Sequence, residues 1–242
     1  MTTSDLPIYI MAECHHLTDE QQRALLDVRK TRRYGRLLKR SIATALLAID
    51  RAGVGMPGAI INGTAMGNLE ETGSMLDALV AEGETASCPT QFMLSTHNTV
   101  ASLLAITTGN HGYNCTYSQS ASSLTCALLD AWLQLRCGHI HSALVMTADV
   151  EPAWWQQVLE RTGSSPLTPP HALALVLSHP REDCDTEPLA ELVSVDLLHR
   201  PSQQALREAL MASRDVHVLH HTDTRGDVSI VKIKPYRNHK VK

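Results

Sequence analysis

The sequence predicts an α/β layered fold with a largely parallel central sheet and helices on both faces. Two observations predict it. Segments with strand and helix patterns alternate up to about residue 150, and paired strands follow. Residues 142–147 (SALVMT) are almost uniformly apolar, which is typical of a strand inside a sheet covered on both faces. The chain of 242 residues is 43% hydrophobic but has one Phe, five Tyr and three Trp, so we expect an aliphatic core.

Helices are expected wherever apolar residues recur every three or four positions. Residues 33–51 show this spacing clearly, and Gly53 ends the pattern. Loops are expected at 87–90 and at 162–170, where Ser, Thr and Pro gather. In chain order the expected helices are 18–30, 33–51, 69–80, 92–107, 124–135, 153–160 and 202–213.

Strands are expected where short apolar or β-branched runs are bounded by Gly, Pro or polar residues. The run 59–62 (AIIN), for example, lies between Gly58 and Gly63. A turn then follows at 63–67 before the next helix. In chain order the expected strands are 7–12, 59–62, 114–117, 142–147, 171–178, 192–198, 216–219 and 228–233.

Bulk properties argue against several classes of protein. The net charge of -4 provides no global basic field for nucleic acid. No apolar run is long enough to span a membrane, and the N-terminus lacks the pattern of a signal peptide. The six cysteines are scattered, which favours free buried thiols over a disulfide scaffold. We therefore expect a cytoplasmic protein with no integral membrane segment.

The most informative stretch runs from Gly112 to Gly138. A strand-like run at 114–117 enters a small-residue elbow at 118–123, and the elbow opens into a long apolar helix at 124–135. A side chain at the start of such a helix lies near unpaired N–H groups and the positive end of the helix dipole, which favour a thiolate. The elbow itself contains no cysteine.

Four segments, in their order and spacing, resemble the N-terminal half of the β-ketoacyl synthases in the thiolase-like superfamily. The resemblance covers about residues 30–180. It implies a thiolase-like layered fold that is truncated relative to full ketosynthases. We expect a single domain over 1–242, with 181–242 as a divergent C-terminal extension. The four segments are RRYGRLLKRSIATALLAIDRAG, IINGTAMGNLEET, CPTQFMLSTHNTVASLLAITTGNHGYN and the elbow with its helix.

The resemblance places an alanine where the family has its nucleophile. The family's catalytic Cys is the tenth residue counted from a Gly in the preceding turn, and counting from Gly112 gives Ala121. A second family Gly follows the Cys by seventeen residues, and counting back from Gly138 again gives Ala121. A slip of one residue would place Ser120 there, and a serine needs a base to attack a thioester. We therefore expect no catalytic residue in this chain.

We expect no counterpart of the family's second half, which carries the two histidines that orient the thioester and drive decarboxylation. About 60 residues follow residue 180, and none of their histidines lies in a family motif. The resemblance thus implies a chain length factor, a non-catalytic subunit that pairs with a full-length β-ketoacyl synthase, here of the small kind associated with aryl-polyene biosynthesis. We expect no enzyme activity from the chain alone, no cofactor and no metal.

Position in the family also implies which residues serve the partner. Met66 would line the end of the acyl channel, and Gln91 and Phe92 would lie in a loop that reaches toward the partner's pocket. In the family, the strand before the nucleophile pairs across the two-fold axis of the dimer. The residues implied at this interface are Asn114, Cys115, Thr116, Tyr117 and Ser118.

The run 29–40 contains seven basic residues and has two interpretations. It is either a solvated helix face or, as in the family, a docking surface for an acidic acyl carrier protein. The docking residues would be Arg32, Arg33, Arg36 and Lys39.

Two other functions stay open. One is an autonomous acyltransferase or thioesterase-like enzyme that uses Cys115, Cys126 or a serine of the elbow, although a buried structural role is the simpler interpretation of both thiols. The other is a carrier-protein binding module without a ketosynthase partner. An acyl adduct on this chain would indicate the enzyme, and co-purification with a ketosynthase would argue against the isolated module.

Overall fold

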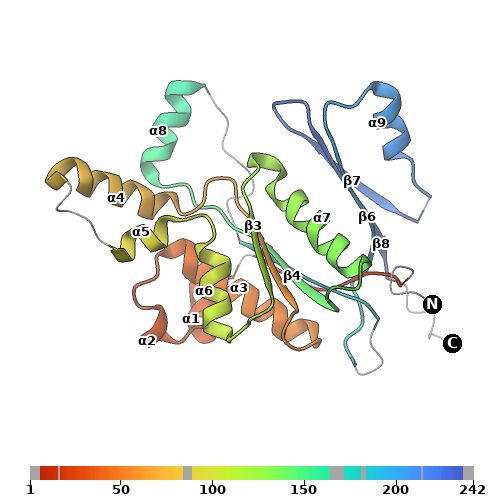
Figure 1. Ribbon diagram of the computed structural model, residues 1–242, viewed down its shortest axis with the longest axis horizontal. Coiled ribbons are helices and arrows are strands. Elements are labelled where there is room, and N and C mark those ends of the chain that lie inside the picture. The colour runs from red at the N-terminus through yellow and green to blue at the C-terminus, as the bar shows by residue number, and fades with distance from the viewer. Residues whose placement is uncertain are drawn as a thin grey trace.

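The computed structural model describes residues 6–15, 17–83, 89–163, 172–180, 184–213 and 215–236. Within these ranges an eight-stranded sheet has helices against both of its faces (Figure 1). The strands are β1 (Tyr9–His15), β2 (Ala59–Gly63), β3 (Tyr113–Tyr117), β4 (Ser142–Thr147), β5 (Leu173–Ser178), β6 (Ala190–Leu198), β7 (His217–Thr222) and β8 (Val228–Pro235). The helices are α1 (Asp19–Leu25), α2 (Val28–Thr31), α3 (Arg36–Ala52), α4 (Leu69–Glu82), α5 (Pro89–Ser95), α6 (Thr99–Thr108), the 3-10 turn η3 (Ser120–Ser122), α7 (Ser123–Arg136), α8 (Ala153–Thr162) and α9 (Gln203–Leu210).

The sheet is mixed, so the expectation that it is largely parallel needs correction. Its strand order is β3-β2-β4-β5-β1-β6-β8-β7. Parallel pairing is confined to β3, β2 and β4, and all other neighbours are antiparallel. The strands β4 and β1 run in the same direction, but β5 lies between them and runs in the opposite direction, so β4 and β1 are not neighbours. Alternation of strands and helices predicts crossovers, but it does not determine which strands become adjacent.

Helices cover both faces of the sheet, as expected. On one face α3 and α6 pack against side chains such as Ile60 and Leu144. On the other face α7 packs against Ile61 and Val145, their immediate neighbours in β2 and β4. Because side chains alternate between the faces of a strand, a strand covered on both sides is buried at every position. That is the case for β2 and for β4, which confirms the interpretation of the apolar run 142–147.

Two expected helices are each divided in the structure. The expected helix 18–30 ends at Leu25, and Asp27 starts α2 because its side chain accepts hydrogen bonds from the N–H groups of Arg29 and Lys30. The expected helix 92–107 is replaced by α5 and α6, with α5 beginning at Pro89. Proline is tolerated in the first turn of a helix, because the backbone N–H that it lacks has no acceptor within the helix at that position. The loops expected at 87–90 and 162–170 lie mostly outside the described residues.

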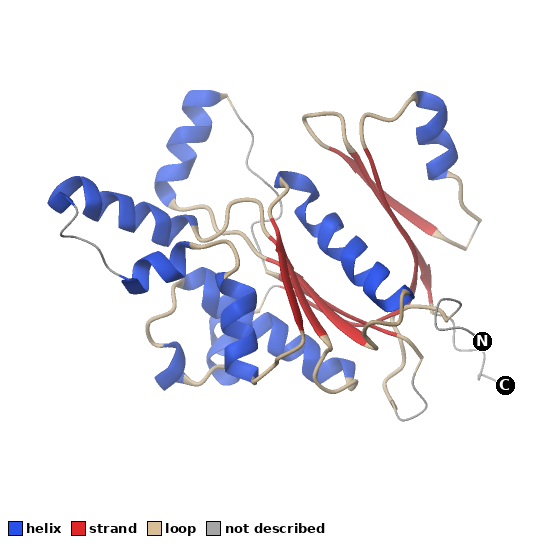
Figure 2. Ribbon diagram, viewed as in Figure 1, coloured by secondary structure: helices blue, strands red, loops and turns tan. Residues whose placement is uncertain are grey.

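The C-terminal strands continue the same sheet. Strands β6, β8 and β7 form its far end, and α7 contacts β6 and β8 as well as β2 and β4. Figure 2 shows α7 lying between these two groups of strands. Among the helices of the described ranges, none combines the length and apolar character needed to cross a bilayer.

Candidate functional site

The candidate site lies where the three parallel strands end. Because β3, β2 and β4 run in the same direction, the segments that follow them meet at one edge of the sheet. These segments are the elbow 118–123 after β3, the turn Thr64–Gly67 after β2, and the loop containing Asp149 after β4. Ligands of open α/β sheets commonly bind at this edge, so the three segments are described in turn.

The elbow is a sharp turn from β3 into α7. Ser120 has a φ of 52°, in the left-handed region that non-glycine residues rarely adopt. Ala121 is exposed in the middle of η3, whereas Ser122 and Ser123 are buried. A methyl group is therefore the side chain presented at the start of this helix. It has no atom that could attack a thioester or move a proton.

The elbow is fixed directly to the end of β2. The Ser123 hydroxyl lies 3.0 Å from the Thr64 carbonyl oxygen and 2.7 Å from that of Ser120, and it accepts a hydrogen bond from the Gln119 N–H. Gly63 permits the close approach, since a Cβ at this position would lie 2.6 Å from the Ser123 carbonyl oxygen. The turn after β2 and the elbow therefore form one packed unit.

The turn Thr64–Gly67 is called the gate turn because it carries Met66, one of the expected gate residues. It is held by a buried carboxylate. Asp149 is 8% exposed. Its Oδ1 accepts from the Thr64 hydroxyl at 2.7 Å and from the Met66 N–H at 2.9 Å, and its Oδ2 accepts from the Ala65 N–H at 3.0 Å. Burial raises the pKa of Asp149, although these hydrogen bonds oppose the rise.

Sequence reasoning missed Asp149. A signal was present, because an acidic residue two positions after a buried strand lies at the same edge as the turn that follows the adjacent parallel strand. The connection spans 85 positions in the chain, so only the pairing of β2 with β4 reveals it.

Gln91 and Phe92 lie in α5 and not in the expected loop. Phe92 is 64% exposed and Gln91 is partly buried. The Asn68 side chain, directly after the gate turn, donates a hydrogen bond to the Leu94 carbonyl and so ties α5 to the start of α4. Asn68 therefore links the turn that carries Met66 to the helix that carries Gln91 and Phe92.

Helices α4 and α5 form an arm with a largely unburied surface, hereafter the apolar arm. The arm projects from the body of the molecule (Figure 1). No residue of α4 is buried, and Leu94 is the buried residue of α5. Clusters of exposed apolar side chains on one element commonly mark an interaction surface. The large exposed apolar residues of the arm are Leu76, Leu79, Val80, Phe92 and Met93.

The expected interface strand β3 is an edge strand. It pairs with β2 on one side, and no strand of the described residues pairs with its other side. Cys115 and Tyr117 pack toward α7, and the Asn114 side chain donates to the Ala101 carbonyl on the opposite face. Burial, with Cys115 and Asp130 nearby, raises the pKa of Tyr113 and Tyr117, so both phenols stay neutral. The expected residue Ser118 lies just beyond the strand and is exposed.

The structure brings together three of the four expected carrier-docking residues. A depression of about 430 Å³ between α1, α2 and α3 includes Arg32, Arg36 and Lys39, together with Arg23. Arg33 is exposed but does not line it. Arg36 forms an ion pair with Glu70 of α4, so part of its charge is already neutralised.

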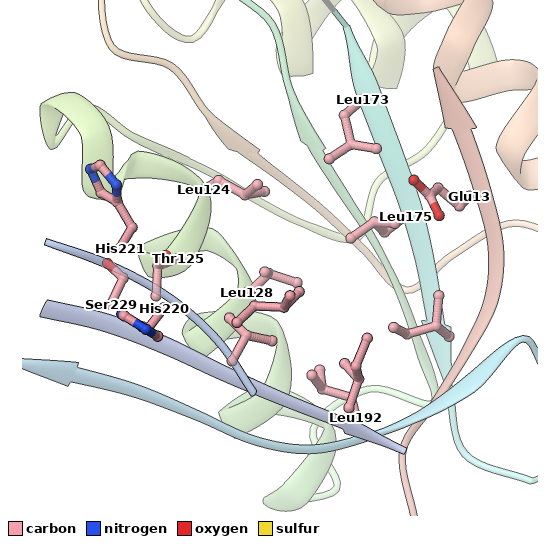
Figure 3. A pocket seen from close by; sticks show the side chains of 14 residues that line it. Glu13, Leu124, Thr125, Leu128, Leu173, Leu175, Leu192, His220, His221 and Ser229 are labelled. Carbon is pink, nitrogen blue, oxygen red and sulfur yellow. The ribbon is translucent and has the colours of Figure 1, made fainter. Parts of the chain in front are cut away.

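A second hollow lies beside α7. It is an apolar trough of about 360 Å³ between the first two turns of α7 and the strands β1, β5, β6, β7 and β8. Leu124, Leu128 and Leu192 line it, and His220 and His221 lie at one end (Figure 3). Sequence reasoning placed these histidines outside any family motif and did not predict that they share a cavity.

The thiols of Cys14 and Cys126 are not poised for nucleophilic attack. Burial raises the pKa of Cys126 despite the positive charge of Arg225, and burial likewise raises the pKa of Cys14. Attack requires a thiolate, and a raised pKa lowers its population. Across the described ranges, no three His, Cys, Asp or Glu side chains are grouped so that they could hold a metal ion.

Comparison with protein families decides the assignment. A family model described as the N-terminal domain of beta-ketoacyl synthase matches residues 12–232. The chain belongs to this family. The match is wider than the stretch of about 30–180 that the sequence motifs covered, and it includes β6, β7 and most of β8. A search among curated proteins finds no match.

Solved ketosynthase structures share the fold. One chain of the complex of the ketosynthase ApeO with its chain length factor ApeC, from Xenorhabdus doucetiae, aligns with a TM-score of 0.64 at 18% identity, over 95% of this chain and 100% of that one. The ishigamide ketosynthase/chain length factor gives 0.72 at 14%, over 96% and 100%. One chain of the AntDE:AntF complex, in which a type II PKS acyl-carrier protein is bound to its ketosynthase, gives 0.80 at 11%, over 96% and 100%. At these identities the likeness concerns the fold.

Proposed function

We propose that this chain is a non-catalytic chain length factor. It pairs with a full-length β-ketoacyl synthase that has the cysteine and both histidines, and it shapes or stabilises that enzyme's acyl pocket. The observation that carries the proposal is the elbow, which keeps a tight strand-to-helix turn but presents the methyl group of Ala121. In this proposal the elbow holds β3 and α7 in place, and the condensation reaction takes place in the partner synthase.

Two features support a heterodimer. The edge strand β3 offers unpaired backbone N–H and C=O groups, which pair readily with a strand of another chain. The apolar arm exposes Phe92 and Val80, with 64% and 86% of their surfaces accessible. A ketosynthase that pairs with β3 and contacts the arm would cover both. Complexes of a ketosynthase with a chain length factor are among the structures that share the fold.

The pathway we propose is polyketide or fatty-acid-type biosynthesis of the aryl-polyene kind, in the cytoplasm. The substrate is an acyl chain delivered by an acyl carrier protein to the partner synthase. An autonomous acyltransferase or thioesterase is less well supported, because burial raises the pKa of Cys126 and the elbow itself has no thiol. Co-expression with a ketosynthase from the same genome, followed by size-exclusion chromatography, tests the pairing. We expect one peak with both chains in equal amounts, and separate elution would contradict it.

We predict that the gate residues influence product length. Phe92→Ala removes an exposed aromatic ring that we place in the partner's acyl pocket, so longer chains should fit. The ratio of longer to shorter products should rise by about tenfold, as expected when several methylenes gain space. Gln91→Ala should act in the same direction but more weakly. Mass spectrometry of products from the purified heterodimer measures both.

Met211→Ala is the control for this prediction. Met211 is also exposed and apolar but lies next to α9, away from the arm. An unaltered product distribution in both Phe92→Ala and Gln91→Ala would refute the assignment of the gate.

We predict that the basic depression docks the carrier protein. The double variant Arg32→Glu and Lys39→Glu reverses two charges that face the same hollow. The dissociation constant for the carrier protein should rise about tenfold at low salt, and the difference should shrink as salt increases. Titration by fluorescence anisotropy measures both effects.

The matched control is Arg29→Glu with Lys30→Glu. These residues are exposed in α2 and do not line the depression, yet the change in net charge is the same. Equal losses of affinity in the two double variants would indicate a general charge effect and would rule out a specific docking surface.

A further inference from the structure

We propose that Asp149 is the positioning residue of the acyl gate, because its carboxylate fixes the backbone from which the Met66 side chain projects. This inference rests on the proposed function and adds to it a residue that no family motif singled out. Its basis is the set of three hydrogen bonds that converge on a single buried carboxylate.

The carboxylate holds the gate turn at consecutive residues. Asp149 accepts from the Thr64 hydroxyl and from the N–H groups of Ala65 and Met66, at 2.7, 3.0 and 2.9 Å. The Thr64 hydroxyl oxygen in turn accepts from the Gly67 N–H at 2.9 Å. All four residues of the turn are thus linked to Asp149, directly or through one hydroxyl. The backbone at Met66 has little freedom while these bonds are intact.

The other side of the turn is attached to the elbow and to the interface strand. The Thr64 N–H donates to the Tyr117 carbonyl of β3 at 2.9 Å. The Ser123 hydroxyl of the elbow lies 3.0 Å from the Thr64 carbonyl oxygen. These bonds hold the start of the turn, at Thr64. The N–H groups of Ala65 and Met66 donate to Asp149, so the position of these two residues depends on that carboxylate.

The site requires a carboxylate and not an amide. Its two oxygens receive three donors, and an asparagine offers one acceptor oxygen and an NH₂ group. Whichever way the amide turns, its NH₂ would face at least one N–H or O–H donor of the turn. Asp149→Asn therefore preserves size but breaks part of the contact, which makes it the informative variant. Loss of a hydrogen bond to a charged acceptor inside a protein has a large effect.

The first measurement needs no product assay. Hydrogen exchange of the Ala65 and Met66 amides, followed by NMR or mass spectrometry in the purified chain with its partner, should accelerate on the order of tenfold in Asp149→Asn. Asp223→Asn is the matched control, because Asp223 also accepts from two backbone N–H groups, in the turn between β7 and β8. It should leave exchange at Ala65 and Met66 unchanged.

The second measurement tests whether Asp149 acts through Met66. Asp149→Asn should alter the product-length distribution of the heterodimer, and it should have no further effect in a Met66→Ala background. A residue with only a structural role would give additive effects. Should Asp149→Asn fold poorly, Thr64→Val removes the hydroxyl donor whereas Thr64→Ser keeps it, so the product shift should appear in the first variant and not in the second.

The outcomes separate the inference from the proposed function. If the heterodimer forms and Phe92→Ala shifts the products while Asp149→Asn shifts neither products nor exchange, the inference is wrong and the function stands. Additive product shifts of Asp149→Asn and Met66→Ala would also overturn it. If no heterodimer forms, the proposed function fails, and the amide exchange of the chain alone still decides whether Asp149 clamps the turn.

Discussion

Gly63→Ala should destabilise the protein by about 3 kcal/mol or more, a loss typical of overpacking against atoms that cannot move aside. The added Cβ would lie 2.6 Å from the carbonyl oxygen of Ser123 and 2.8 Å from the N–H nitrogen of Leu124. Both are backbone atoms at the start of α7, so relief requires the elbow to move away from β2. Urea denaturation followed by circular dichroism measures the change in the free energy of unfolding.

Gly58→Ala is the control, because Gly58 directly precedes the first residue of the same strand. Its Cβ would approach atoms of Ile140 and Ser142 no closer than 3.4 Å, which is ordinary contact. We expect a change within about 1 kcal/mol. If Gly63→Ala were as stable as Gly58→Ala, the elbow would not be packed on β2 as described, and the link between the elbow and the gate turn would be lost.

Lysines on the edge of β3 should weaken the heterodimer about a hundredfold, because a charged edge opposes the addition of another strand. The variant is Asn114→Lys, at an exposed position of β3, with Ser118→Lys, at the exposed residue just beyond the strand. The dissociation constant is measured by analytical ultracentrifugation of labelled chains. The melting temperature of the isolated chain is recorded as well, since Asn114 also donates to the Ala101 carbonyl.

The opposite edge of the sheet supplies the control. His217→Lys with Thr222→Lys places the same added charge on β7, which is the last strand of the sheet. These positions are exposed as well. We expect little effect on pairing there. If the two double variants weakened the complex equally, β3 would not be the interface strand.

The features that local pattern determines were predictable from the sequence. The buried strand 142–147 and the sequence of strand, elbow and apolar helix around Ala121 agree with β4, β3, η3 and α7. Each depends on residues close together in the chain, such as an uninterrupted apolar run or a group of small residues before a helix. The counting that placed Ala121 at the elbow likewise uses short spacings.

Features that depend on distant contacts were not predictable. The insertion of β5 between β4 and β1, together with the antiparallel pairing of β1, β6, β8 and β7, makes the sheet mixed, although strands and helices alternate up to about residue 150. Asp149 acquires its role from a turn far away in the sequence, through the pairing of β2 and β4. Arg36 was grouped with its basic neighbours, but its ion pair with Glu70 depends on where the fold places the start of α4 relative to the start of α3. The burial of a side chain such as Asp149, and the residues with which it forms hydrogen bonds or ion pairs, are determined by the tertiary fold.

The central claim is that this chain supports condensation without carrying the acyl group. Its most direct test is native mass spectrometry of the co-expressed chain and ketosynthase after incubation with an acyl-loaded carrier protein. We predict a one-to-one complex in which the acyl adduct is found on the partner synthase and not on this chain. An acyl adduct on this chain, at the elbow or at Cys115 or Cys126, would contradict the account.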